Sequence, residues 1–215
     1  MSDPYTLIVG AAPVPARESA YGGIIRAASH VIAADGGFGV CMAADRLPDL
    51  VVGDLDSIAA EALDQAARLG VPVRRYPVEK DQSDLDLALL HAREAGARAV
   101  RFTAAFSGRL DHTLAALGTV LRSADLGSRI EEPDLQGYAL DARNRASLTL
   151  DARAGQRLSV FAIDRSTVVD LSGVRYPLTD APLPVLSSLG LSNLALGGEL
   201  SVTVHAGSVV VLVTA

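Results

Sequence analysis

Short apolar runs alternate with stretches of helical periodicity from Tyr5 to about Ala124. This alternation is typical of a parallel sheet with helices on its faces. The predicted strands are 5–9, 31–34, 49–52, 71–75 and 99–103, and the predicted helices are 18–29, 58–69, 83–95 and 110–121. We therefore expect an N-terminal, Rossmann-like α/β domain.

The pattern changes after roughly Asp125, where Gly, Pro, Ser and Thr punctuate runs of strand length. The clearest predicted strands in this part are 158–163, 200–204 and 209–213. The segment Ala206-Gly207-Ser208 is a plausible hairpin connection between the last two. We expect a C-terminal antiparallel β-sandwich domain and divide the chain into 1–143 and 144–215.

The composition of the 215 residues is that of a soluble globular protein, with 49% hydrophobic and 20% charged residues. No apolar run approaches the roughly 20 residues that span a bilayer, and the N-terminus lacks the basic start of a secretory signal, so we expect a cytoplasmic protein. A net charge of −6 argues against a broad nucleic-acid or membrane surface. The single cysteine, Cys41, excludes an intrachain disulfide and is predicted to be a core thiol within a helix. The four histidines show no zinc-site spacing.

Two carboxylates follow the third predicted strand, in the stretch Val51-Val52-Gly53-Asp54-Leu55-Asp56-Ser57. Residues two apart in an extended chain point to the same side, so Asp54 and Asp56 are expected to aim at one point. Two anions this close repel each other unless a cation lies between them, and Mg²⁺ prefers carboxylate oxygens. Ser57 is expected to cap the next helix. Taken alone, the stretch fits either a metal site or an ordinary turn with a helix cap.

Asp35 follows the second predicted strand directly. Gly36 and Gly37 come next and lack side chains, so backbone amides there can approach a phosphate or nucleotide. The alternative is a simple turn between strand and helix.

The stretch Lys80-Asp81-Gln82-Ser83-Asp84-Leu85-Asp86 opens a predicted helix, with Ser83 and Asp86 resembling a capping box. The helix dipole favours carboxylates in a first turn, which gives Asp84 and Asp86 a structural explanation. Lys80 adds a cation beside the acids, and metal-binding carboxylates with a neighbouring lysine are what phosphoryl transfer from a nucleotide requires.

Ser107-Gly108-Arg109-Leu110-Asp111-His112 again joins a strand to a helix. The planar guanidinium of Arg109 is suited to phosphate oxygens. Asp111 either orients Arg109 or joins a metal shell, and the sequence leaves both open. His112 is an acid or base, or else a capping or core residue.

Together these stretches resemble, in order and spacing, the motifs of the thiamine pyrophosphokinase family. In the α/β domain the motifs are Ala34-Asp35-Gly36-Gly37, Gly53-Asp54-Leu55-Asp56-Ser57, Asp81-Gln82-Ser83-Asp84 and Gly108-Arg109-Leu110-Asp111-His112. The resemblance continues in the β domain at Gly173-Val174-Arg175-Tyr176-Pro177-Leu178 and Leu191-Ser192-Asn193, so it covers nearly the whole chain. Each motif is weak alone, but the ordered set is specific.

The resemblance implies transfer of the intact pyrophosphoryl group from ATP to the hydroxyethyl oxygen of thiamine, giving thiamine diphosphate and AMP. On the family pattern, Asp54, Asp56 and Asp84 would hold Mg²⁺, and Lys80 and Arg109 would meet phosphate charge. The remaining residues of the ATP side would be Asp35, Gly36, Gly37, Ser57, Asp81, Asp111 and His112.

The resemblance also implies that Tyr176, Ser192 and Asn193 contact thiamine. Family members are homodimers whose site lies between the α/β domain of one subunit and the β domain of the other. Thiamine carries a fixed positive charge, which an aromatic face such as that of Tyr176 attracts. Without the family, Tyr176 is an ordinary β-domain residue, and Ser192 and Asn193 merely close a turn.

Three residues depart from the family pattern. Ser83 stands where threonine is common and keeps the hydroxyl. Ser107 replaces a frequent glycine, which narrows the phosphate approach, and Leu194 stands where an acid is common. Two other functions therefore stay open: a Mg²⁺-nucleotide phosphotransferase acting on another alcohol, and a catalytically silent protein that binds thiamine or its diphosphate.

Overall fold

The computed structural model describes residues 3–56, 58 and 60–214, which form two compact units. The first unit holds the chain up to Leu126 together with Glu131–Pro133, and the second holds Gly127–Ile130 and the chain from Asp134 onward. This division lies earlier in the chain than the predicted boundary after residue 143. The reason is that strand β7 (Leu135–Asp141) pairs along its whole length with the last strand of the chain.

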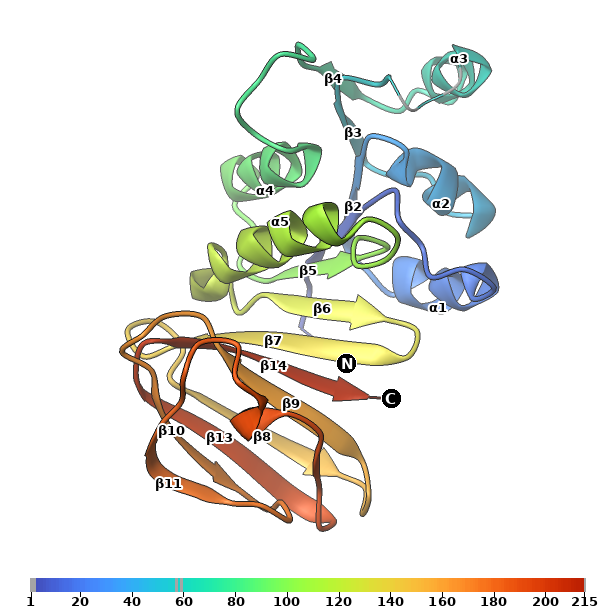
Figure 1. Ribbon diagram of the computed structural model, residues 1–215. Helices are drawn as coiled ribbons and strands as arrows, with labels where there is room; N and C mark the ends of the chain where they lie inside the picture. The colour runs from blue at the N-terminus through green and yellow to red at the C-terminus, as the bar shows by residue number, and fades with distance from the viewer. Residues whose placement is uncertain (1–2, 57, 59, 215) are drawn as a thin grey trace. The chain divides into compact units, whose positions relative to one another are not determined.

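The first unit is built on a parallel sheet with the strand order β4-β3-β2-β1-β5 (Figure 1). Ile32, Ile8 and Phe102 lie side by side across three of its strands and are fully buried. Such apolar runs are what a sheet covered on both faces requires. The strands lie close to their predicted positions: β1 (Thr6–Val9), β2 (His30–Ala34), β3 (Leu50–Gly53), β4 (Val73–Arg75) and β5 (Val100–Thr103).

The direction in which strands are added reverses beside β1. The chain proceeds outward from β1 through β2 and β3 to β4, and then places β5 on the other side of β1. Open α/β sheets bind ligands beyond the carboxyl ends of their strands at such a reversal. The loops that follow β1 and β5 therefore border the expected ligand crevice.

Helices cover both faces of this sheet, with α1, α2 and α3 on one side and α4 and α5 on the other (Figure 1). The predicted helix over 18–29 is shorter than expected, because a 3₁₀ turn (Glu18–Ala20) leads into α1 and two glycines weaken the helix. No helix in the described ranges has the length and apolar character of a membrane span. The helices are α1 (Tyr21–Arg26), α2 (Gly37–Ala43), α3 (Ala60–Arg68), α4 (Asp84–Glu94) and α5 (Leu110–Leu121), followed by a 3₁₀ turn (Ala124–Leu126).

Cys41 of α2 lies in the apolar core on the α1–α3 side of the sheet. Burial raises the pKa of its thiol to about 12. The thiol is therefore neutral and unreactive at physiological pH, which confirms the predicted core role.

The second unit is an antiparallel β-sandwich, as predicted. One sheet has the order β12-β9-β14-β7 and the other β11-β10-β13-β8. Apolar side chains from both sheets, such as Leu158 and Leu171, form one buried core between them. Besides β7, its strands are β8 (Ser147–Ala152), β9 (Arg157–Ala162), β10 (Val168–Ser172), β11 (Leu178–Pro182), β12 (Asn193–Leu194), β13 (Gly198–Ala206) and β14 (Ser208–Thr214), with a 3₁₀ turn at Ser188–Gly190; the residues of β6 (Arg129–Glu132) are divided between the two units.

The predicted hairpin at Ala206-Gly207-Ser208 is wrong. Strand β13 pairs with β8 and β10, whereas β14 pairs with β7 and β9, so Gly207 joins one sheet of the sandwich to the other. Gly207 has a φ of 75°, and a Cβ at this position would lie 2.5 Å from side-chain oxygens of Asp164 and Thr167. A glycine between two apolar strands is expected for a hairpin and equally for a sharp corner between sheets.

Candidate active site

Three strands of the parallel sheet end in residues with left-handed backbone geometry. The φ angles are 49° at Asp35 after β2, 68° at Leu55 after β3 and 51° at Ala104 after β5, and all three residues are buried. Residues other than glycine rarely adopt this conformation, and such positions gather at functional sites. The backbone therefore marks the carboxyl edge of this sheet as the candidate site.

The stretch that carries Asp54 and Asp56 is a turn rather than the predicted extended segment. The left-handed residue Leu55 reverses the chain between the two, and the Asp56 N–H donates a hydrogen bond to Asp54 Oδ1 at 3.2 Å. The side chains of Asp54 and Asp56 are therefore not brought together by the alternation of an extended strand. Both residues nevertheless border the same cleft, with Asp56 exposed at its edge.

Three carboxylates from different elements converge at this edge. Ligand oxygens of Asp35, Asp54 and Asp84 all lie within 4.8 Å of one another. Lys80 joins them, with its Nζ 2.8 Å from Asp54 Oδ2 and 3.2 Å from Asp84 Oδ1. The structure thus brings Asp35 beside two of the three predicted ligands. The sequence contains a signal for the position of Asp35, because Asp35 directly follows β2, the strand that pairs with β3.

The ionisation of these groups follows from their contacts. The hydrogen bond from Lys80 lowers the pKa of Asp54, whereas burial raises the pKa of Asp84. Burial alone would lower the pKa of Lys80, but its hydrogen bonds to the two carboxylates outweigh that effect, so the pKa is raised. Lys80 therefore keeps its charge, and the three acids together outnumber it.

The donor set fits a hard divalent cation. All the candidate ligands are carboxylate oxygens, which Mg²⁺ prefers. Asp35, Asp54 and Asp84 would hold such an ion if their oxygens, which lie within 4.8 Å of one another, drew closer around it.

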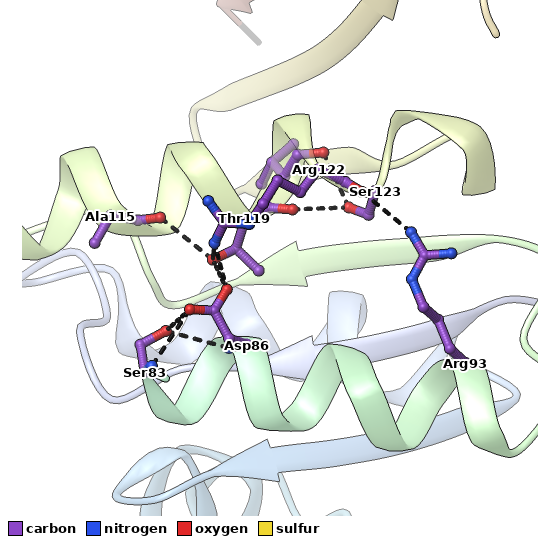
Figure 2. Close-up of polar contacts among 8 residues, drawn as sticks. Ser83, Asp86, Arg93, Ala115, Thr119, Arg122 and Ser123 are labelled. Atoms are coloured by element: carbon purple, nitrogen blue, oxygen red, sulfur yellow. Dashed lines mark hydrogen bonds and ion pairs between the residues drawn. The ribbon is translucent and has the colours of Figure 1, made fainter. Parts of the chain in front are cut away.

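Asp86 fixes the start of α4, and with it Asp84, through the network in Figure 2. One carboxylate oxygen of Asp86 accepts hydrogen bonds from the Ser83 N–H and Oγ at 3.3 and 2.9 Å, which confirms the predicted capping box. The other accepts from Thr119 Oγ1 at 2.7 Å, in the last turn of α5, and from Arg122, the C-cap residue of that helix. Burial alone would raise the pKa of Asp86, but these hydrogen bonds outweigh that effect, and the pKa is lowered. Asp86 thus has a structural role, whereas Asp84 faces the cleft.

Arg109 and Asp111 form an exposed two-point ion pair at the start of α5. Arg109 Nε and Nη2 lie 3.2 and 2.6 Å from the Asp111 oxygens, and the Arg109 side chain is 70% exposed. Arg109 lowers the pKa of Asp111 to about 2. Of the two roles left open for Asp111, this geometry favours orientation of Arg109. The neighbouring His112 is exposed at the cleft.

A cleft of about 820 Å³ in the first unit is bordered by the acidic cluster, by Asp56 and by Arg109 and His112. Its size is within the range of small-molecule and cofactor sites. Sequence reasoning did not identify the loop after β1, which contributes one wall of the cleft but carries no charged side chain before Arg17. The residues that line it include Gly10, Ala11, Ala12, Pro13, Pro15, Asp35, Asp54, Asp56, Ser83, Asp84, Ala105, Ser107, Gly108, Arg109 and His112.

Three more residues predicted for the ATP side lie around the start of α2 and in the loop before α4: Gly36, Gly37 and Asp81. A Cβ at Gly37 would lie 2.1 Å from the Val9 carbonyl oxygen, so close packing of α2 on β1 explains this glycine. Gly36 is the N-cap residue of α2, and Asp81 is exposed in the loop before α4. Ser57 lies outside the described residues.

In the second unit, Asn193 holds the backbone of Tyr176. The Tyr176 N–H donates to Asn193 Oδ1 at 3.0 Å, and Asn193 Nδ2 donates to the Tyr176 carbonyl oxygen at 2.7 Å. Asn193 is only 4% exposed, whereas Tyr176 is 62% exposed and has the Arg175 guanidinium 5.7 Å from its ring. Ser192 is exposed with a φ of 57°. The Asn193 amide therefore supports the segment, and the Tyr176 ring is presented to solvent.

Two family models match this chain one after the other. The catalytic domain of thiamin pyrophosphokinase matches residues 21–131, and the vitamin B1 binding domain of thiamin pyrophosphokinase matches residues 146–211. The chain belongs to the thiamin pyrophosphokinase family. The first match contains the acidic cluster and most of the cleft, and the second contains Tyr176 and Asn193.

Relatives and solved structures agree with this membership. Thiamine pyrophosphokinase of Bacillus subtilis is 26% identical over 164 residues, covering 75% of this chain and 76% of that protein. Thiamine pyrophosphokinase 1 of Arabidopsis thaliana is 26% identical over 169 residues, covering 75% of this chain and 62% of that protein. The crystal structure of thiamine pyrophosphokinase from Bacillus subtilis has a TM-score of 0.83 at 21% identity, covering 97% of this chain and 98% of that one. That of yeast thiamin pyrophosphokinase has a TM-score of 0.78 at 12% identity, covering 100% and 87%. These likenesses confirm the predicted fold class.

Proposed function

We propose that this protein is a thiamine diphosphokinase, which transfers the pyrophosphoryl group of ATP to the hydroxyethyl oxygen of thiamine. A bond forms between that oxygen and the β-phosphorus, and the bond breaks between the β-phosphorus and the oxygen that joins it to the α-phosphorus. AMP leaves with that joining oxygen, and the hydroxyl proton is released. The observation that carries the proposal is the cluster of Asp35, Asp54 and Asp84 with Lys80, in a chain that matches both domains of the family.

We infer that Asp54 and Asp84 hold Mg²⁺ together with Asp35 or Asp56. When bound, Mg²⁺ neutralises charge on the phosphate oxygens and orients them. The contacts of Lys80 with two of the carboxylates support its role as a fixed positive charge beside the phosphates. Arg109, which Asp111 orients, supplies a second positive charge across the cleft.

We assign thiamine to the second unit. The exposed ring of Tyr176 is suited to the thiazolium cation, for which a cation–π contact contributes roughly 0.5 to 2 kcal/mol. Ser192 is exposed and precedes Asn193, which acts through the backbone of Tyr176. The cytoplasmic location remains a prediction.

The deciding experiment is a product assay with purified protein, ATP, Mg²⁺ and thiamine. We expect thiamine diphosphate and AMP in equal amounts, neither of them when Mg²⁺ is removed, and about 10² to 10³ times slower formation of both with Asp54→Asn. If ATP binds but neither product forms, the proposed reaction is wrong. A phosphotransferase acting on another alcohol then becomes the better hypothesis, and a panel of alcohols tests it.

We further propose a homodimer in which each site combines the first unit of one subunit with the second unit of its partner. Mixed dimers of Asp54→Asn and Tyr176→Ala protein should then recover part of the parent activity, because one of the two sites contains neither change. Verified mixed dimers without recovery would contradict shared sites, and gel filtration of the parent gives the oligomeric state.

A further inference from the structure

One wall of the cleft consists of two loops joined by backbone hydrogen bonds near the sheet. These loops are 10–17 after β1 and 104–109 after β5. The Gly10 N–H donates to the Thr103 carbonyl at 2.9 Å, and the Ala12 N–H donates to the Ala104 carbonyl at 2.7 Å. Further from the sheet, the described parts of the two loops are linked by hydrogen bonds of side chains instead of backbone groups. Two such links are present.

The first link is the buried carboxylate of Glu132, at the end of β6. One of its oxygens accepts a hydrogen bond from the Ala105 N–H at 3.2 Å, and the other accepts from the Tyr21 hydroxyl. That hydroxyl in turn accepts from the Val14 N–H at 2.8 Å. Glu132 is 6% exposed and Tyr21 is fully buried. One carboxylate therefore connects the loop after β5 with the loop after β1.

The direction of these hydrogen bonds follows from the chemistry of the groups. Burial and the nearby Glu132 carboxylate both raise the pKa of Tyr21, so the phenol keeps the proton that it donates. A buried carboxylate is stable only when hydrogen bonds compensate for its lost hydration. Glu132 accepts one such bond directly from the loop after β5 and the other from Tyr21 of α1, whose hydroxyl accepts from Val14 of the loop after β1. Displacement of the loop after β5 would leave a Glu132 oxygen unsatisfied, and displacement of the loop after β1 would break the bond between Val14 and Tyr21.

The second link is Ser107, whose Oγ lies 2.8 and 2.9 Å from the carbonyl oxygens of Ala12 and Pro13. All three residues border the cleft. Ser107 thus contacts the opposite loop while it lines the cleft, and the narrowing of the phosphate approach stays a prediction. The two links act in parallel on the same pair of loops.

We propose that Glu132 is a positioning residue for nucleotide binding, which holds the loops after β1 and β5 together as one wall of the cleft, with Ser107 as a second, parallel tie. The inference rests on the proposed function, which puts ATP in this cleft. Neither Glu132 nor Tyr21 lines the cleft. Glu132 and Tyr21 therefore affect ATP binding through the positions of the two loops.

The test uses Tyr21→Phe, Ser107→Ala and the double variant, with Tyr5→Phe as the matched control. Tyr5 is a buried tyrosine at the opposite end of β1, so the control removes a similar hydroxyl far from the loops. The dissociation constant of ATP is measured by calorimetry with Mg²⁺ and without thiamine. Thermal unfolding, kcat and both KM values are measured on the same samples.

We expect Tyr21→Phe to weaken ATP binding about five- to tenfold, because it leaves the Val14 N–H and a Glu132 oxygen without partners. kcat and the thiamine KM should stay within about threefold of the parent. The double variant should weaken ATP binding by more than the product of the single effects, since either tie partly substitutes for the other. Glu132→Gln should retain most of the ATP affinity, because its amide oxygen still accepts from the Ala105 N–H and its NH₂ donates to the Tyr21 oxygen, although the Tyr21 proton loses its acceptor. Glu132→Ala should lose that affinity.

The proposal is overturned if Tyr21→Phe and the double variant lower the unfolding temperature but bind ATP as tightly as the Tyr5→Phe control. If the parent binds ATP but forms no thiamine diphosphate, the proposed function fails, while the series of dissociation constants still decides the role of Glu132. A parent protein that binds no ATP would overturn both.

Discussion

Asp54 and Asn193 both belong to motifs of the family, yet the structure uses their side chains in opposite ways. The Asp54 carboxylate meets two other carboxylates and a lysine at an open cleft. The Asn193 amide is buried and satisfies the backbone of Tyr176. Clustered acids repel one another, so they favour binding of a cation. A buried amide whose hydrogen bonds are satisfied instead stabilises the fold. A motif residue can thus serve the ligand directly or serve it only by shaping the chain.

The largest effect is expected for Asp54→Asn. Turnover should fall by about 10² to 10³, the usual loss for one preorganised electrostatic group. The free energy of unfolding should fall only slightly, because the change weakens the contact with Lys80 that lowers the pKa of Asp54 but also relieves repulsion among the acids. Steady-state kinetics and urea unfolding check the two parts. Turnover within a few-fold of the parent would remove Asp54 from the metal site.

Asn193→Ala should lower the free energy of unfolding more than it lowers turnover. We expect the free energy of unfolding to fall by about 2 to 3 kcal/mol, because the backbone groups of Tyr176 lose a buried partner. Urea unfolding measures this, and Asn144→Ala serves as the control because Asn144 is exposed. If Asn193→Ala is as stable as the control but loses thiamine affinity, Asn193 contacts the ligand and the contrast with Asp54 disappears.

Tyr176→Ala tests the exposed residue that Asn193 supports. The thiamine KM should rise about tenfold while the ATP KM is unchanged, because only a cation–π contact is removed. Stability should change little, since the ring is 62% exposed. An unaltered thiamine KM would exclude Tyr176 from the site.

The smallest effect concerns Asp86, the structural acid beside Asp84. Its pKa is lower in the folded protein than in the unfolded chain, so the unfolded state binds more protons as the pH falls. Asp86→Asn should therefore reduce the free energy of unfolding by about 1 kcal/mol above about pH 4, where an unfolded aspartate is ionised. The difference from the parent should shrink as the pH falls below that value. A difference that is constant from pH 7 to pH 3 would contradict this role.

Sequence reasoning succeeded where the signal is local. Apolar runs predicted the parallel strands, and acids at strand ends predicted the cleft, because the carboxyl ends of parallel strands share one edge of a sheet. The turn at Leu55 was not foreseeable from alternation, since a left-handed leucine has no distinct sequence signature. The pair of Tyr21 and Glu132 is separated by 111 residues and depends entirely on the tertiary fold. Strands β6, β7, β8, β10, β11 and β12 were not among the predicted strands. Strand β11 gives a weak signal because none of its residues is fully buried and it contains a proline.

The three acids of the cluster come from different parts of the chain, after β2, after β3 and at the start of α4. During synthesis from the N-terminus, the first two emerge well before Asp84. The nascent chain can therefore assemble this cluster only after α4 has left the ribosome and packed on the sheet. A cation that needs all three carboxylates would therefore bind only after α4 is in place.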